Sequence, residues 1–388
     1  MAKTNSSWRI ALAGAAALAS ALGIGRFALT PILPGMQDAA GIGDATAGLI
    51  AGANNLGYMI GALAALAVPA RMRPASLRLC LVLGAVCALA MALAANWYLW
   101  AGFRFIAGLA SAGAMVFGAS LVIDALRRTG RPNLIGVHFG GVGIGIALTG
   151  AFVWALSSVG DWRIEWLTLG AVALLAALYD WRGIAGDDAG AGPHAATAQH
   201  FARRRFAFLT VAYFCEGLGY SVTVTFIVVW LKRLLPGPDG LLAWIVLGLA
   251  AAASPILWSL AGARWSAQRA LLAAYLLQAI GIVLPLAGTL PATLIGAVLF
   301  GGTFVAITGL ALSAGAGLLP PVRSAAVLTF AFGVGQTLGP IAAGYAATVS
   351  GGFALPLIGA AGFVLLGAAS LLPFVLSGPA RPASPTSN

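Results

Sequence analysis

The feature that most constrains the fold is a series of twelve long apolar runs, separated by short polar segments. A helix needs about 20 consecutive apolar residues to cross the hydrocarbon core of a bilayer. Only 8% of the 388 residues are charged and 61% are hydrophobic, which is too apolar for a soluble domain with one buried core. We therefore expect an all-α integral membrane protein, because lipid leaves an open chain no other way to satisfy its backbone.

The apolar runs predict where the spans lie. We expect them at 10–34, 46–69, 77–95, 98–124, 134–157, 162–180, 206–231, 241–261, 270–290, 292–316, 324–348 and 354–376. A signal peptide over residues 1–22, with Ala19-Ser20-Ala21 as the cleavage site, is the alternative for the first run. That run continues to Leu33, however, so it is long enough to span the membrane.

The basic residues predict the orientation. The net charge of +11 could indicate nucleic-acid binding, but the basic residues lie in short loops between apolar runs, so we expect no nucleic-acid partner. With the N-terminus inside, sixteen of the 21 basic residues fall in inner segments, three in outer loops, and Arg26 and Arg104 within spans. Cytoplasmic loops carry the excess of Lys and Arg, which predicts that both termini lie in the cytoplasm.

Two glycine patterns predict an internal repeat. Gly23–Arg26 in the first span matches Gly217–Tyr220 in the seventh, and Phe139–Gly143 in the fifth span matches Ala331–Gly335 in the eleventh. Both matches have nearly the same separation along the chain, which predicts two parallel six-helix repeats. We expect an N-terminal bundle over 1–182, a cytoplasmic linker over 183–205 and a C-terminal bundle over 206–388.

Arg26 is the strongest candidate for a functional side chain. An ionised group in hydrocarbon costs several kcal/mol or more, so it normally faces a water-filled cavity or a partner. Pro31 and Pro34 are expected to end or bend the helix beyond it. We therefore expect a central cavity around Arg26; the alternative is a side chain that reaches the outer surface.

Glu216 is the only carboxylate near the middle of a span. A lone carboxylate there should be protonated or paired. Tyr220 matches Arg26 in the repeat, and Glu216 lies one helical turn before it. Our hypothesis is that Glu216 and Arg26 face one cavity and exchange partners during transport, the alternative being a permanent structural pair.

Other polar side chains in the spans are weaker candidates. His138, the only histidine in a span, could carry a proton, although a hydrogen-bonded core residue is the commoner role. Five more could bind substrate or simply bond neighbouring helices: Asn54, Asn55, Tyr58, Tyr213 and Gln336. Asp124, at the inner end of the fourth span, is expected to form a gate or a helix-end ion pair.

With six plus six helices and a basic central loop, the chain resembles the major facilitator superfamily over nearly its whole length. The run Arg104–Gly108 resembles the superfamily's fourth-helix arginine-glycine motif, which implies a role for Arg104 in proton coupling; a surface-seeking arginine is the alternative. The Gly-Arg-Phe-Ala and Pro-x-Leu-Pro sequences of the first span, with His138–Gly143, look most like the YbfB/YjiJ-type bacterial branch.

The loop after the second span departs from the superfamily's pattern. That pattern reads Gly-x-x-x-Asp-Arg-x-Gly-x-Arg-Arg, whereas Gly61 to Arg78 keeps basic residues at Arg71, Arg73 and Arg78 but contains no aspartate. We expect Arg71 and Arg73 at a cytoplasmic gate that is held differently from that of the superfamily.

These features together predict a proton-coupled secondary transporter whose halves rock about a midplane site. The buried positive charges favour an anionic or carboxylate-bearing solute, and export of hydrophobic or cationic drugs is the alternative. The glycine run from Gly136 to Gly150 resembles an exporter motif but lacks its Gly-Pro step. We expect a monomer whose partners are a small-molecule substrate, protons and the lipid bilayer.

Other classes of protein fit the sequence poorly. The glycine runs follow no strand and precede no Gly-Lys-Ser/Thr, so we expect no ATP site and no other cofactor. The three cysteines have no metal-ligand spacing. A membrane enzyme would need clustered His, Asp or Glu, and a sensor would need a soluble output domain.

Overall fold

The computed structural model describes residues 2–158, 160–183, 199–234, 240–350, 352 and 354–376. All regular structure in these ranges is helical. Within them, 12 helical segments are long and apolar enough to cross a membrane, which confirms the predicted number of spans. Residues 184–198, which form most of the expected linker, lie outside the described residues.

The first span is divided into several segments, and the other spans are each built on one long helix. The segments of the first span are α1 (Ala2–Leu18), η1 (Ala19–Ile24), α2 (Gly25–Phe27) and α3 (Leu29–Ala40). The next five helices are α4 (Asp44–Ala64), α5 (Arg73–Leu93), α6 (Trp97–Arg128), α7 (Ile135–Leu156) and α8 (Trp162–Gly183). The last six are α9 (Gln199–Leu234), α10 (Gly240–Trp265), α11 (Ala267–Val283), α12 (Leu290–Gly315), α13 (Pro321–Ser350) and α14 (Ala354–Leu376).

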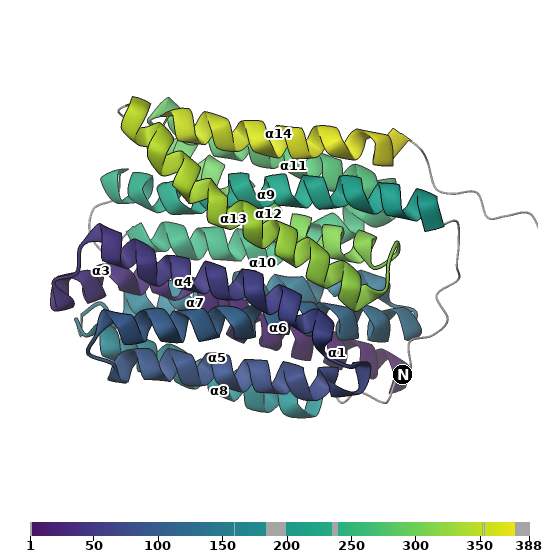
Figure 1. Ribbon diagram of the computed structural model, residues 1–388, viewed down its shortest axis with the longest axis horizontal. Coiled ribbons are helices and arrows are strands. Elements are labelled where there is room, and N and C mark those ends of the chain that lie inside the picture. The colour runs from purple at the N-terminus through teal and green to yellow at the C-terminus, as the bar shows by residue number, and fades with distance from the viewer. Residues whose placement is uncertain are drawn as a thin grey trace, which may run out of the picture.

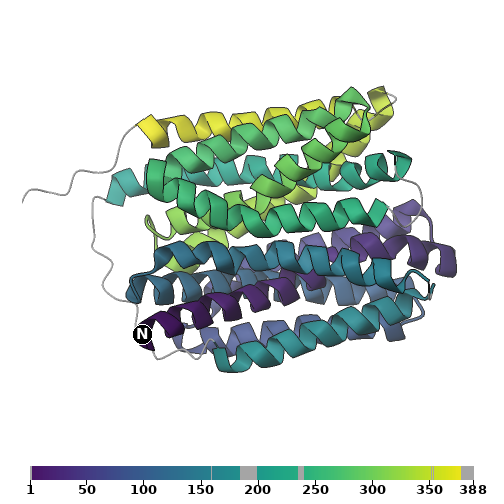
Figure 2. The ribbon, with the colours of Figure 1, turned by 180° about the vertical axis from the view of Figure 1, so that it is seen from behind.

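The helices run side by side along the long axis and fall into two groups (Figure 1). The helices up to α8 form one group, and α9 to α14 form the other, as the view from behind also shows (Figure 2). We call these groups the N-terminal half and the C-terminal half. The halves meet mainly where α7 packs on α10 and where α4 packs on α13.

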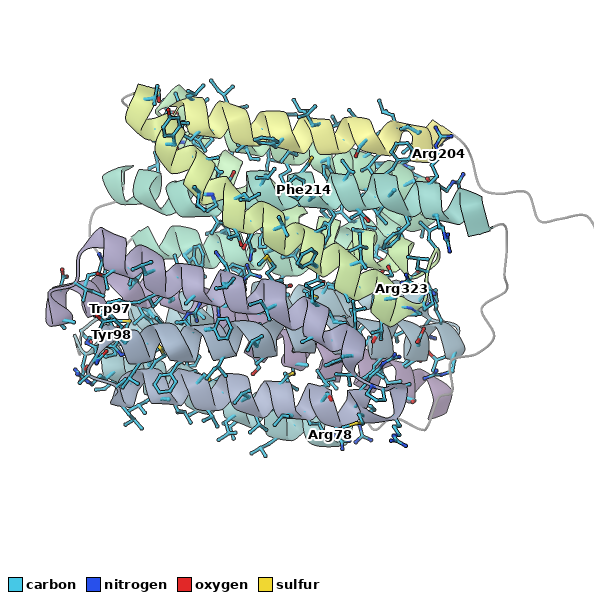
Figure 3. The ribbon with its side chains drawn as sticks, in the orientation of Figure 1. Arg78, Trp97, Tyr98, Arg204, Phe214 and Arg323 are labelled. Atoms are coloured by element: carbon cyan, nitrogen blue, oxygen red, sulfur yellow. The ribbon has the colours of Figure 1, made fainter. Side chains whose placement is uncertain are left out.

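The outer surface of the bundle is apolar. Large side chains such as Leu79, Leu175, Ile341 and Leu366 are more than half exposed. Contact between such a surface and water is unfavourable, whereas contact with lipid tails is not. Arg78, Arg204 and Arg323 lie at one end of the bundle, which we call the basic end, and Trp97 and Tyr98 lie at the other, which we call the aromatic end (Figure 3).

Pro31 and Pro34, which were expected to end or bend the first span, do not end it, and the helix break nearest to them is at Ala28, between α2 and α3. Pro31 lies in the first turn of α3, where a missing N–H costs little, and Pro34 lies inside this helix, which continues to Ala40. Burial of Ile32 and Met36 against a core that includes Trp162 and Trp166 holds the helix in place. The helix ends at Gly41, whose φ of +63° suits glycine.

Candidate functional site

The irregular part of the first span lies directly before Arg26. The chain forms a π-helical turn over Ala19–Ile24, followed by the three-residue α2 that contains Arg26. Gly23 makes this geometry possible because a Cβ added there would lie 2.3 Å from the Cα of Gly145 on α7. Wide turns of this kind often occur at functional sites.

Arg104 fixes the backbone of this irregular segment. Its side chain is 3% exposed, and its Nη1 and Nη2 donate to the main-chain oxygens of Gly25 and Arg26, both at 2.7 Å. The Arg104 guanidinium therefore faces the interior. The alternative, a side chain that reaches the membrane surface, does not describe this conformation. Its contacts assign it a positioning role for Arg26.

Gly108, the second residue of the arginine-glycine motif, allows α6 to approach α4. A Cβ added at Gly108 would lie 2.1 Å from the main-chain oxygen of Asn54 on α4. The side chain of Asn54 donates to the main-chain oxygen of Arg104 at 2.9 Å. Asn54 thus bonds a neighbouring helix, and the motif joins α6 both to the first span and to α4.

Arg26 lies where the two halves meet. Its Nη2 donates to Oδ1 of Asn55 on α4 at 3.4 Å and to Oε1 of Gln336 on α13. Gln336 in turn donates to Oδ1 of Asn55 at 3.2 Å. The guanidinium also lies over the ring of Tyr58, 4.2 Å from its centroid, in a cation–π contact. We call Arg26, Asn55, Tyr58 and Gln336 the Arg26 site.

In this conformation Arg26 is buried among side chains of both halves, and an open central cavity around it stays a prediction. Arg26 is 9% exposed, and its partners Tyr58 and Gln336 are buried more deeply. The amide oxygens of Asn55 and Gln336 accept the hydrogen bonds of the Nη2 of Arg26. The groups that Arg26 contacts here are neutral, so its positive charge has no counter-charge among them.

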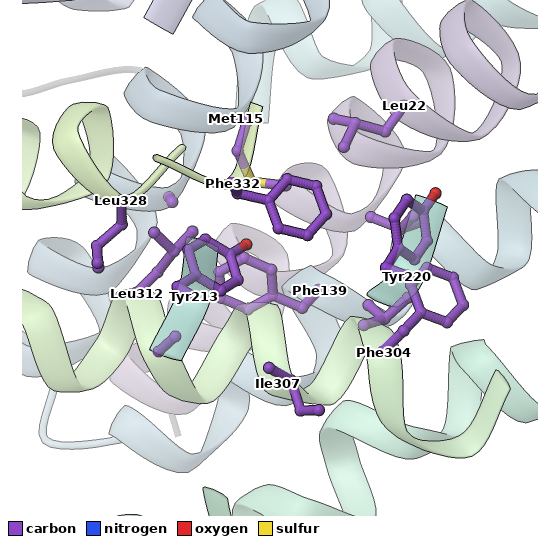
Figure 4. Close-up of a cluster of buried hydrophobic side chains, with 14 of the residues drawn as sticks. Leu22, Met115, Phe139, Tyr213, Tyr220, Phe304, Ile307, Leu312, Leu328 and Phe332 are labelled. Carbon is purple, nitrogen blue, oxygen red and sulfur yellow. The ribbon is translucent and has the colours of Figure 1, made fainter. Parts of the chain in front are cut away.

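An aromatic cluster fills the neighbouring part of the interior (Figure 4). The ring of Tyr220 lies 5.3 Å from Phe304 and 5.4 Å from Phe332, and the ring of Tyr213 lies 4.9 Å from Phe332. The Tyr213 hydroxyl donates to Thr308 at 3.0 Å. Tyr220, the repeat counterpart of Arg26, therefore packs with the aromatic rings of its own half.

Glu216 is fully buried, but it does not pair with Arg26. Its Oε1 accepts a hydrogen bond of 2.7 Å from Nε2 of Gln278 on α11, within the C-terminal half. The two side chains are therefore not paired in this conformation, as a permanent structural pair would require, and their exchange of partners during transport stays a prediction. The partner that Glu216 has instead is a neutral donor, Gln278, which carries no charge signal in the sequence.

His138 occupies the core of the N-terminal half. It is fully buried, and its Nδ1 would lie 2.4 Å from a Cβ added at Gly14 of the first span. Its ring also meets Phe139 edge-on, with centroids 4.9 Å apart. The structure does not bring His138 into the Arg26 site.

The predicted gate residues lie at the basic end. Asp124 of α6 is close enough to Arg73 at the start of α5 for their charges to interact, whereas Arg71 is exposed. The contact that joins the halves there was not predicted: Arg127 donates to the main-chain oxygens of Ala316 at 3.2 Å and Ser313 at 3.4 Å. No sequence signal marks a main-chain acceptor, so only the tertiary structure could identify this contact.

Glycines bring α7 and α10 together across the two halves. A Cβ added at Gly136 would lie 2.6 Å from the oxygen of Pro255, and one added at Gly143 would lie 2.0 Å from the nitrogen of Ala252. Toward the aromatic end, Nε1 of Trp244 donates to Thr149 at 3.3 Å. Several glycines of the run from Gly136 to Gly150 are thus packing positions between the halves.

Comparison with known proteins identifies the family. The model of the family described as "Uncharacterised MFS-type transporter YbfB" matches residues 18–372. The chain belongs to this family. As a member, it is a transporter of the major facilitator type and not an enzyme, and it is a multi-pass membrane protein. Comparison with curated proteins gives no match.

Two solved structures show the same fold as this YbfB-family chain. The crystal structure of the human organic anion transporter MFSD10 is similar with a TM-score of 0.71 and 17% identity, over 94% of this chain and 99% of that one. The transporter FucP in its outward conformation is similar with a TM-score of 0.69 and 16% identity, over 96% of this chain and 99% of that one. The predicted major facilitator fold is therefore confirmed.

Proposed function

We propose that this transporter carries an anionic or carboxylate-bearing solute across the bacterial inner membrane by alternating access, coupled to protons. The observation that carries the proposal is the Arg26 guanidinium, which is buried between the halves and whose hydrogen-bond partners among the described residues, Asn55 and Gln336, are neutral. A buried charge without a counter-charge is costly, and an anionic solute would supply one.

A solute carboxylate would replace the two amide oxygens on Arg26. A guanidinium binds a carboxylate through two parallel hydrogen bonds, which are stronger than bonds to neutral amides. Asn55 belongs to the N-terminal half and Gln336 to the C-terminal half, so their release would loosen one contact between the halves. This links solute binding to rocking of residues 1–182 against residues 206–388.

The distribution of side chains at the two ends supports an orientation with both termini in the cytoplasm. Arg78, Arg204 and Arg323 lie at the basic end, and Trp97 and Tyr98 at the aromatic end (Figure 3). Excess basic residues favour the cytoplasmic side, and Trp and Tyr favour membrane interfaces. The basic end would therefore face the cytoplasm.

The test is uptake of a panel of organic acids into proteoliposomes with an imposed inward proton gradient. We expect the wild type to take up at least one acid, Arg26→Ala to lose this uptake, and Arg26→Lys to retain part of it because the charge remains. Arg269→Ala, which removes an exposed arginine, is the matched control and should transport normally. Normal uptake by Arg26→Ala would reject the proposal.

Export of hydrophobic or cationic drugs is the second candidate function. The buried carboxylate of Glu216 lies on the same helix as Tyr213 and Tyr220 of the aromatic cluster, and aromatic faces attract organic cations. Drug sensitivity of a deletion strain without any organic-acid phenotype would favour this function. Competition of uptake by organic acids would favour the first.

A further inference from the structure

Five buried side-chain oxygen atoms of the described residues in the C-terminal half have no hydrogen-bond partner. Two are the hydroxyls of Ser313 and Ser324, and the other three belong to residues that interact with one another: Oε2 of Glu216, Oε1 of Gln278 and the hydroxyl of Tyr275. All three residues are 0% exposed. Leaving polar atoms unbonded in an apolar interior is costly, so each such atom requires an explanation.

The first two atoms belong to groups that are already joined. Nε2 of Gln278 donates to Oε1 of Glu216 at 2.7 Å, which leaves the second oxygen of the carboxyl group and the oxygen of the amide. An ionised carboxylate only accepts hydrogen bonds, and so does an amide oxygen. Two acceptors cannot bond each other, so this arrangement leaves both unsatisfied while Glu216 is ionised.

A single proton removes this conflict. We propose that Glu216 is a proton-binding site in which Oε2 carries the proton and donates it to Oε1 of Gln278. The acid and the amide are then joined by two hydrogen bonds, one in each direction, and no charge remains in the interior. The proton comes from water and returns to water, and no other bond forms or breaks.

The surroundings of Glu216 favour a proton over a cationic side chain or a metal ion. The titratable groups that interact with Glu216 are Tyr213, Cys215, Tyr220 and Tyr275. The only charged residue of α13 is Arg323 in its first turn, and α14 contains none. The charge of Arg26 interacts with Tyr213 and Tyr220, but its guanidinium donates its hydrogen bonds within the Arg26 site. The described residues hold no group of three or more metal-ligating side chains.

The site deepens the proposed function, because its role in coupling rests on proton-coupled transport. Loss of the proton would leave a negative charge inside the C-terminal half, with Gln278 as its only bonding partner seen here. Such a charge favours a conformation that exposes Glu216 to water or to Arg26. Proton release would therefore accompany a change in the contact between the halves.

Infrared spectroscopy of the purified full-length protein in lipid tests the proton site without any solute. A protonated carboxylic acid has a C=O stretch that a carboxylate lacks. We expect this band in the wild type at neutral pH, and we expect Glu216→Gln to remove it. Glu216→Gln preserves the size of the side chain and retains a donor for Gln278, so the variant should fold.

Two further variants complete the test. Glu165→Gln removes the other buried carboxyl group among the described spans, and the Glu216 band should remain. Gln278→Leu should shift the band toward that of an acid whose carbonyl accepts no hydrogen bond. An unchanged spectrum in Glu216→Gln would overturn the proton site, and so would a band that disappears only in Glu165→Gln.

The spectra also separate failure of this site from failure of the proposed function. If the band behaves as expected but no organic acid is transported, the proton site stands and the proposed solute is wrong. If organic acids are transported and Arg26→Ala abolishes their uptake, but Glu216→Gln leaves the spectrum unchanged, the function stands and the proton site is wrong.

Discussion

Nη2 of Arg104 lies 2.7 Å from the main-chain oxygen of Arg26, so the side chain of one buried arginine positions the backbone of the other. A second bond of the same length joins Arg104 to Gly25. The first span is irregular at this point, because α2 is only three residues long. Arg104 therefore sets where the Arg26 guanidinium lies, although the two guanidinium groups have different partners.

Replacing Arg104 should destabilise the protein and displace Arg26. Hydrogen bonds from a charged donor contribute about 1.5–3 kcal/mol each, and Arg104→Ala removes two. We expect a clearly lower Tm in detergent, with Arg104→Lys intermediate because one ammonium cannot reproduce the planar fork. The matched control is Arg323→Ala, which removes an exposed arginine. If Arg104→Ala melts with the wild type, the positioning role is wrong.

Gly143→Ala should force α7 and α10 apart. The added Cβ would lie 2.0 Å from the main-chain nitrogen of Ala252. Because this neighbour is a main-chain atom, the clash can be relieved only by a shift of one helix relative to the other. Overpacking of this kind costs about 1–3 kcal/mol, and here it acts on a contact between the halves. We expect a lower Tm and a larger loss of transport in proteoliposomes.

Gly102→Ala is the control for Gly143→Ala. Gly102 also lies within a helix, α6, but a Cβ added there meets nothing within 4 Å. Alanine in an open helical position stabilises by roughly 0.5–1 kcal/mol relative to glycine. Gly102→Ala should therefore raise the Tm slightly and leave transport intact. Equal effects of the two substitutions would show that close packing of α7 on α10 does not matter.

Arg127→Ala should loosen the basic end. It removes the two hydrogen bonds from α6 to the main-chain oxygens of Ser313 and Ala316. The bond to Ser313 is exposed to solvent. A loss of about 1 kcal/mol corresponds to roughly a fivefold change in an opening equilibrium. Hydrogen exchange of residues 313–319 should accelerate by about that factor. Arg128→Ala, one residue along and exposed, should leave exchange unchanged, and the idea fails if both variants behave alike.

Glu216→Gln should separate exchange of solute from proton-driven transport. The variant keeps the neutral, hydrogen-bonded form of the side chain but can no longer release a proton. We expect exchange of labelled for unlabelled solute at a near-normal rate, and loss of uptake driven by a pH gradient. Both rates are measured in the same proteoliposomes. Normal gradient-driven uptake by Glu216→Gln would exclude Glu216 as the coupling residue.

Much of the site could be predicted from the sequence because charge at membrane depth is rare. Arg26 and Glu216 stand out in apolar runs, and both are buried in the structure. Asn55 and Gln336 were weaker candidates, since neutral polar residues in spans also bond neighbouring helices. The structure brings both of them to Arg26. Gln278 was missed because nothing in its own segment distinguishes it from other polar residues.

The direction of each side chain could not be predicted in the same way. Two consecutive breaks in regularity, the π-turn over Ala19–Ile24 and the short α2, set the rotation of Arg26 about the helix axis. A small rotation decides whether a buried group meets the opposite half or its own. Arg26 meets Gln336 of the opposite half, whereas Glu216 meets Gln278 of its own half.

The sequence alone determined that the chain crosses a bilayer in twelve helices and that it resembles the major facilitator superfamily. Those properties depend on the length and polarity of the apolar runs and on the spacing of residues, and all of these are features of the linear sequence. Only the tertiary structure decided that Arg104 holds the backbone of Arg26, that Arg127 joins the halves at the basic end, and that Glu216 bonds Gln278. These contacts join segments far apart in the chain, and they depend on helix rotation and on main-chain acceptors that residue identity does not specify.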